Sequence, residues 1–80
     1  MTVYDLIPLN SLSRGQSARV DQVIGLPDQV HRLEELGIRS GAEVQMVEPG
    51  GACIVRLAGG KLCFRADELL RVLVRPGASV

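Results

Sequence analysis

Residues 27–41 read PDQVHRLEELGIRSG, and this stretch predicts a short helix. Pro27 suits the first position of a helix, where a missing N–H costs nothing, and Asp28 lies favourably at the positive end of the helix dipole. Apolar residues then recur at helical spacing, while the opposite face is charged; the apolar ones are Val30, Leu33 and Leu36. We expect one convincing helix within residues 25–37.

The same stretch also predicts where the helix ends. Gly37 fits the left-handed position that closes many helices, because glycine adopts positive φ without steric cost. Ile38 follows directly and can contact Leu33, which is the hydrophobic contact that accompanies a Schellman ending. The chain is therefore expected to leave the helix at Gly37 and to turn at Ser40-Gly41 into a strand.

Short apolar runs between glycine-rich turns predict five β-strands around this helix. Val23 breaks the alternation of the first run, which indicates a bulge near Asp21. Before it, the segment from Tyr4 to Leu12 is interrupted by Pro8 and predicts an extended or turning lead-in. Residues 67–70 predict a short turn. The predicted strands cover residues 16–24, 43–48, 52–58, the run after Gly60 to Phe64, and 71–75.

Gly59-Gly60 predicts a two-residue hairpin, because the primed turns that match strand twist require positive φ. The pairs across it would be Leu57 with Leu62, Arg56 with Cys63, and Val55 with Phe64. In this register Cys53 and Cys63 lie on opposite faces, so a disulfide between them has the wrong geometry. We expect two reduced thiols with a structural role.

Together these elements predict a mainly β fold. A single domain over residues 1–80 would have about five strands, with the short helix between the first and the second strand. So few strands bury one face most economically by curling into a barrel, and closure would remove exposed edges. Because Tyr4 and Phe64 are the only aromatic residues, the core is expected to be aliphatic.

Charge and hydropathy exclude several classes of function. Nine basic and nine acidic residues balance, and like charges do not cluster, so nucleic-acid binding is not expected. No apolar run approaches the roughly 20 residues that cross a bilayer, and the start of the chain lacks the pattern of an export signal. A cytoplasmic protein is expected, with any link to a membrane made through a partner.

No residue pattern predicts catalysis, a metal site or a cofactor. His31 is the only histidine and has no second His or Cys three or four residues away, and neither CxxC nor HExxH occurs. Glu34-Glu35 and Asp67-Glu68 are adjacent in sequence, which does not make them converge on a cleft. Phosphate-binding glycine motifs are absent from the sequence. We expect binding without chemistry.

The run RLEELGIRSG at residues 32–41, followed by Val44, resembles the central motif of the FeoA family, RL-x-x-LG-(I/L/M)-x-x-G-x-x-(V/I). Leu69 departs from the small alanine that is usual there, and residues 26–28 differ from the commoner linkers. Flanking positions extend the resemblance over nearly the whole chain; they are Leu9, Leu12, Gly15, Ala18, Val20 and Gly25 before the motif, and Leu62, Phe64, Arg65, Glu68, Val72 and Val74 after it.

The resemblance implies a small SH3-like barrel that acts with the FeoB-type ferrous iron transporter, a membrane GTPase. It would bind the cytoplasmic part of that protein and modulate its assembly or its activity. The surface is expected to include the exposed side of the helix and the loop after it, although Arg32 could equally have a structural role. The candidate partner-binding residues are Leu26, His31, Arg32, Glu35 and Arg39.

Two alternative interpretations share the fold. The first is the SH3-like carboxy-terminal domain of iron-dependent repressors, which follows a winged helix and a dimerisation helix. It is disfavoured because we expect a free-standing chain. The second is a KOW-like barrel that associates with nucleic acid or the ribosome, which neutral charge and few aromatics disfavour. Self-association, which small barrels of this type show, is left open.

Overall fold

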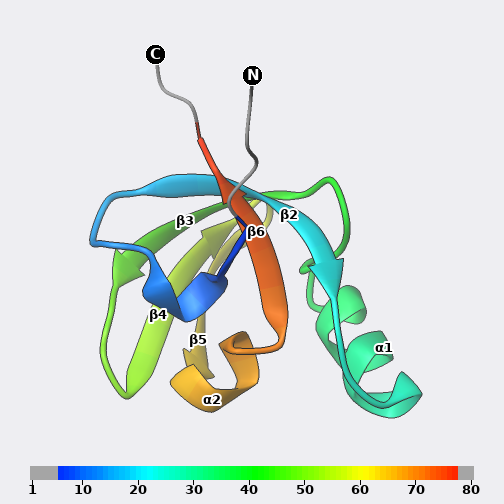
Figure 1. Ribbon diagram of the computed structural model, residues 1–80. Coiled ribbons are helices and arrows are strands. Elements are labelled where there is room, and N and C mark those ends of the chain that lie inside the picture. The colour runs from blue at the N-terminus through cyan, green and yellow to red at the C-terminus, as the bar shows by residue number, and fades with distance from the viewer. Residues whose placement is uncertain (1–5, 78–80) are drawn as a thin grey trace, which may run out of the picture.

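A computed structural model describes residues 6–77, which form a curled antiparallel sheet with a helix at one side (Figure 1). Tyr4, the start of the predicted lead-in, lies outside the described residues. No helix within 6–77 is both long and apolar enough to span a bilayer. In chain order the elements are β1 (Ile7–Pro8), the 3-10 helix η1 (Leu9–Ser11), β2 (Ser17–Val23), α1 (Pro27–Glu35), β3 (Glu43–Glu48), β4 (Ala52–Leu57), β5 (Gly60–Arg65), α2 (Ala66–Leu69) and β6 (Val72–Pro76).

The sheet has six strands in the order β1-β6-β2-β3-β4-β5, so the prediction of about five strands was wrong. The missed strand is β1, whose two residues pair with Val74 and Leu73 of β6. Two residues are too few to show alternation, and Pro8 cannot donate to a ladder, so no sequence pattern marks this strand. As a result α1 lies between the second and the third strand.

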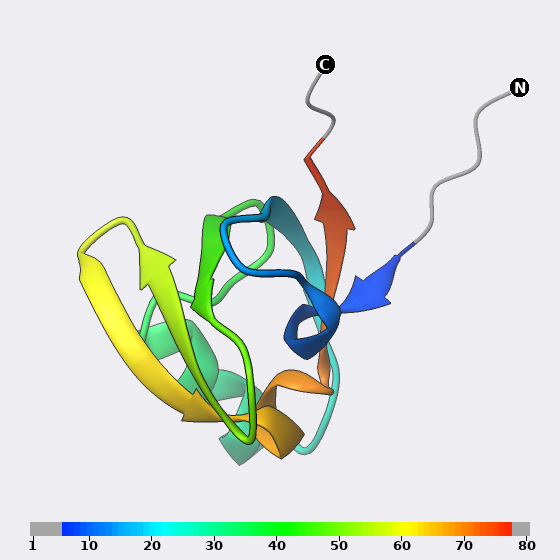
Figure 2. The ribbon, with the colours of Figure 1, turned by 90° about the vertical axis from the view of Figure 1, so that its left-hand side faces the viewer.

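The prediction of a closed barrel was also wrong. β1 and β5 are the two ends of the sheet and do not pair with each other, although the sheet curls strongly (Figure 2). In place of a hydrogen-bonded ladder, η1 and α2 pack together, and each contributes a fully buried leucine, Leu9 and Leu69. The side chains buried between these two short helices complete the core, so the core does not require pairing of β1 with β5.

An aliphatic core fills the inside of the curled sheet, as composition predicts. Phe64 is its only aromatic member, and the described residues contain no buried charged side chain. Every element except β1 contributes to it, so the whole chain from η1 onward shares one core. The buried residues are Leu9, Leu12, Ala18, Val20, Leu33, Ile38, Val44, Met46, Cys53, Val55, Leu57, Phe64, Leu69, Val72 and Val74.

The β4–β5 hairpin turns one residue earlier than predicted. Leu57 pairs with Gly60, so Ala58 and Gly59 form the loop, and the three predicted pairs were wrong. Neither loop residue has a positive φ, whereas Gly60 has φ +136°, so the turn is not of the primed type. Because the error spans two positions in the pairing, the faces are unchanged: Cys53 is buried, Cys63 is exposed, and both thiols are free.

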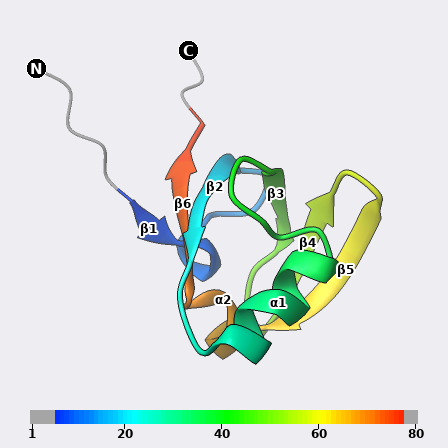
Figure 3. The same ribbon diagram turned by 90° about the vertical axis from the view of Figure 1, so that its right-hand side faces the viewer.

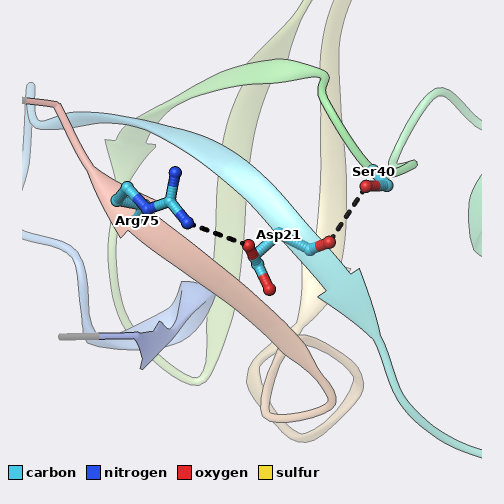
Figure 4. Close-up of polar contacts among 3 residues, drawn as sticks. All are labelled: Asp21, Ser40 and Arg75. Atoms are coloured by element: carbon cyan, nitrogen blue, oxygen red, sulfur yellow. Dashed lines mark hydrogen bonds and ion pairs between the residues drawn. The ribbon is translucent and has the colours of Figure 1, made fainter. Parts of the chain in front are cut away.

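The predicted bulge at Asp21 is confirmed, and it organises a small polar network (Figure 4). The register of β2 against β6 shifts between Val20 and Gln22. Arg75 Nη2 of β6 lies 3.2 Å from Asp21 Oδ1, and Ser40 Oγ donates a hydrogen bond of 3.0 Å to the Asp21 carbonyl. The bulge therefore fixes the loop that follows α1 to the sheet.

Candidate functional site

The helix α1 begins at the predicted proline and ends at the predicted glycine, with local hydrogen bonds at both ends. Pro27 is its first residue, and Gln29 Oε1 accepts a hydrogen bond of 3.3 Å from the Leu26 N–H. At the other end Gly37 has φ +107°, its N–H donates to the Glu34 carbonyl at 3.0 Å, and the Ile38 N–H donates to the Leu33 carbonyl at 2.9 Å. These two bonds are those of the Schellman motif, so the predicted ending is confirmed.

Most of α1 is exposed to solvent. Of its nine residues only Leu33 is buried, with 4% of its surface exposed. Val30 is half-buried, and Leu36, which the apolar spacing places on the core side, is 40% exposed. The helix lies beside the curled sheet (Figure 3). A narrow apolar face attaches it to the sheet, and the rest of its surface is exposed and can bind another molecule.

Three of the predicted partner-binding residues lie together on the outer side of α1. His31 Nε2 is 3.0 Å from Glu35 Oε2, and both side chains are largely exposed. Arg39 Nη2 donates a hydrogen bond of 3.1 Å to the Glu34 carbonyl, where it caps the negative end of the helix. With Glu34, these three residues line a shallow open hollow of about 330 Å³.

Arg32 is directed to a different side of the helix. Its Nη2 lies 3.2 Å from Glu68 Oε2, which links α1 to α2. Gln29, Leu33 and Arg71 complete a small hollow around this pair. The structure therefore divides the predicted site: Arg32 belongs to the α1–α2 junction, whereas His31, Glu35 and Arg39 form the outer face.

Leu26, the fifth candidate, belongs to an exposed apolar patch that the sequence analysis did not identify. Leu26 is 66% exposed, Ile24 50% and Leu70 54%. The Ile24 N–H donates to the Arg71 carbonyl at 2.8 Å, which brings the end of β2 beside the end of α2. Three large exposed apolar side chains at one end of the molecule, next to the arginines of the α1–α2 junction, are typical of a protein-binding surface.

Residues 6–77 hold no group of three or more His, Cys, Asp or Glu side chains close enough to bind a metal ion. The imidazole of His31 has Glu35 as its neighbour, and Cys53 Sγ donates to the Gly50 carbonyl at 3.3 Å. The arrangement at α1 offers charged, amide and apolar groups for recognition.

These features define a small β domain whose helix displays polar and apolar contacts. The model of the FeoA domain matches residues 7–76, which is most of the chain. The chain belongs to the FeoA family. No curated protein matches it.

Solved structures agree with this assignment. FeoA of Stenotrophomonas maltophilia, described as a prokaryotic SH3 domain protein in complex with zinc, is 32% identical with a TM-score of 0.75, over 85% of this chain and 88% of that one. A crystal structure of an iron uptake regulatory protein (FeoA) has a TM-score of 0.86 at 24% identity, over 91% and 100% of the chains. The fold is therefore SH3-like.

The likeness to metal-dependent repressors concerns the fold alone. IdeR of T. acidophilum is 17% identical with a TM-score of 0.83, and the match covers 96% of this chain but 37% of the repressor. The fold thus makes up most of some FeoA chains and only part of the longer IdeR chain.

Proposed function

We propose that this chain is a non-catalytic accessory protein of a ferrous iron uptake system. It binds the cytoplasmic part of the FeoB-type membrane GTPase transporter and modulates the assembly or the activity of that transporter. Membership of the FeoA family supports the system, and the description of the Stenotrophomonas relative as a candidate ferrous iron transport activating factor agrees with it.

The observation that carries a binding role is the low burial of α1. A nine-residue helix attached by one buried leucine contributes little to the core, yet it presents His31, Glu35 and Arg39 on one face and Leu26 at its start. Apolar side chains beside charged ones are the composition of a protein interface, where the apolar part gives affinity and the charged part gives specificity.

The test is a binding measurement between this chain and the cytoplasmic domain of its cognate transporter. Leu26→Asp is expected to weaken binding most, by about tenfold or more, because it places a charge in the apolar part of the contact. Arg39→Glu is expected to weaken binding less, because an exposed charge acts mainly on the association rate. The matched control is Arg14→Glu, since Arg14 is an exposed arginine in the turn before β2, where it pairs with Glu48 at 2.7 Å.

Circular dichroism and thermal unfolding must show that each variant folds, because Arg39 also caps α1. If Leu26→Asp and Arg39→Glu bind as well as the unaltered protein, α1 is not the contact surface. Absence of any binding by the unaltered protein would refute the transporter partner itself.

A further inference from the structure

Among the strands that residues 6–77 form, β5 is a free edge of the sheet. It pairs with β4 on one side and is the last strand in the order on the other (Figure 2). The opposite end of the sheet is β1, which has only two residues and contains Pro8, so it offers almost no hydrogen-bonding edge. β5 has six residues, which is long enough to receive another strand.

The pairing of β4 with β5 shows which backbone groups of β5 point outward. The Ala66 N–H donates to the Gly51 carbonyl at 2.9 Å, and hydrogen-bonded pairs then alternate along the ladder. Phe64, Leu62 and Gly60 therefore bond to β4. The N–H and C=O groups of Lys61 and Cys63 point away from β4. The N–H and C=O groups of Arg65 also point away from β4, but its N–H already donates a hydrogen bond of 3.1 Å to Glu68 Oε1.

The same hairpin carries the charge asymmetry of the protein. Residues 52–65 contain Arg56, Lys61 and Arg65 and no acidic residue, whereas the rest of the chain has six basic and nine acidic residues. Arg56 pairs with Lys61 across the hairpin, and Lys61, Cys63 and Arg65 share the outer face. Within residues 6–77, Arg56, Lys61 and Arg65 make no ion pair, so their positive charges are available to a partner.

Beside β5 lie an exposed apolar side chain on the inner face and a groove whose lining is partly charged. Leu62 lies on the face of the buried Phe64 but is 38% exposed, because no neighbouring strand covers it. An open groove of about 520 Å³ borders the second half of β5. Arg32 and Glu68 line its far side, together with Ala52, Cys63, Phe64 and Arg65.

We propose that β5 binds an extended acidic segment of a partner protein, which adds to the sheet as a seventh strand. The backbone groups of Lys61 and Cys63 hydrogen-bond to the segment. Alternate carboxylates of the segment lie on the outer face near Lys61 and Arg65, and the side chains between them lie against Leu62. The preferred ligand alternates acidic and apolar residues. This surface is separate from the outer face of α1, so the inference goes beyond the function proposed above.

The charges of β5 disfavour a second copy of this chain as the occupant. Antiparallel pairing of two β5 strands about Cys63 would place Lys61 opposite Arg65 twice, and like charges directly opposite each other destabilise a strand pair. Lysine on a free edge is also a known device against such pairing. An acidic strand would instead place carboxylates opposite Lys61 and Arg65, and these contacts would be attractive.

The experiment uses a capped, fluorescent peptide that alternates Glu and Val, titrated with the protein at low ionic strength. A peptide of the same composition with the Glu residues in one block keeps the charge and loses the alternation. We expect the alternating peptide to bind at least about tenfold more tightly, because only its carboxylates can all lie on one face of a strand. Binding should protect the amides of Lys61 and Cys63 from hydrogen exchange.

Two variants separate backbone pairing from charge. Cys63→Pro removes an outward N–H without breaking the β4 ladder and leaves every charge in place, and it is expected to weaken binding about tenfold or more. Lys61→Glu is expected to have a similar effect through charge. Arg19→Glu is the matched control, since Arg19 is exposed on β2, three strands away from β5. If Cys63→Pro fails to fold, Lys61→Pro tests the neighbouring outward N–H.

Several results would overturn the proposal. Equal binding of the alternating and the blocked peptide, or full binding by folded Cys63→Pro or Lys61→Pro, would leave only nonspecific charge attraction. Tighter binding of a single-stranded oligonucleotide than of the alternating peptide would assign the cations to a nucleic acid. Oxidation that yields a Cys63–Cys63 dimer in place of peptide binding would assign the edge to self-association.

Discussion

The curled sheet and the helix α1 use their side chains in opposite ways. In the sheet, alternate residues of β2, β3, β4 and β6 are almost fully buried, and each strand contributes at least two of them to the core. In α1 one residue of nine is buried. The sheet thus holds the molecule together, whereas the helix is held by local capping and a single anchor. A region that contributes so little to stability can vary its surface for recognition at low cost to the fold.

The largest effect is expected where the core closes without a strand pair. Leu9→Ala removes a fully buried side chain from η1, where η1 packs on α2. The expected loss is about 3–5 kcal/mol of unfolding free energy, because surrounding elements cannot collapse into the space. Urea unfolding measures it. A loss below about 1 kcal/mol would mean that η1 and α2 do not complete the core.

A leucine-to-alanine substitution in α1 is expected to cost less than the one in η1. Leu33→Ala removes the anchor of the helix, which lies at the rim of the core with 4% of its surface exposed. We expect a loss of about 2 kcal/mol, at the low end for Leu→Ala, because the helix can shift to fill part of the space. Hydrogen exchange should show α1 opening more readily while the β2–β6 amides stay protected. Equal effects of Leu9→Ala and Leu33→Ala would contradict the contrast between the two regions.

A smaller effect is expected at the end of α1. Gly37→Ala forces a residue with a Cβ into φ +107°, at an expected cost of about 1–2 kcal/mol in thermal unfolding. Space is not the reason, since an added Cβ would lie at ordinary contact distance, 3.5 Å, from Leu57 Cδ1. Gly59→Ala is the matched control: Gly59 does not have a positive φ and its surroundings are open, so its substitution should change stability by less than about 0.5 kcal/mol.

Local signals in the sequence predicted α1, its Schellman ending, the bulge at Asp21 and the separation of the two cysteines. Each depends on residues close in the chain, such as Gly37 with Ile38, so a short window contains the cause. The strand β1 and the open sheet could not be predicted in this way. They depend on Ile7 meeting Val74 and on Leu9 and Leu69 filling one space, which are contacts between residues far apart in sequence.

For the candidate site, the sequence located the helix but not the sides on which its residues lie. The predicted helix and the loop after it placed His31, Arg32, Glu35 and Arg39 near one another. The structure then separated Arg32, which pairs with Glu68 of α2. The exposed patch of Ile24, Leu26 and Leu70 exists because β2 ends beside α2. No pattern in the sequence predicts it.

The sequence by itself determined the aliphatic core, the helix α1 with its end at Gly37, and the family, because composition, glycine conformation and a contiguous motif are properties of the chain. The short turn predicted at residues 67–70 was wrong, since the helix α2 (Ala66–Leu69) lies there. Tertiary structure alone decided that β1 joins the sheet and that α1 is almost entirely displayed. It also decided that β5 is left as a basic free edge. These follow from which distant segments pack together in the core, since a strand or a face is exposed only when no other part of the chain covers it.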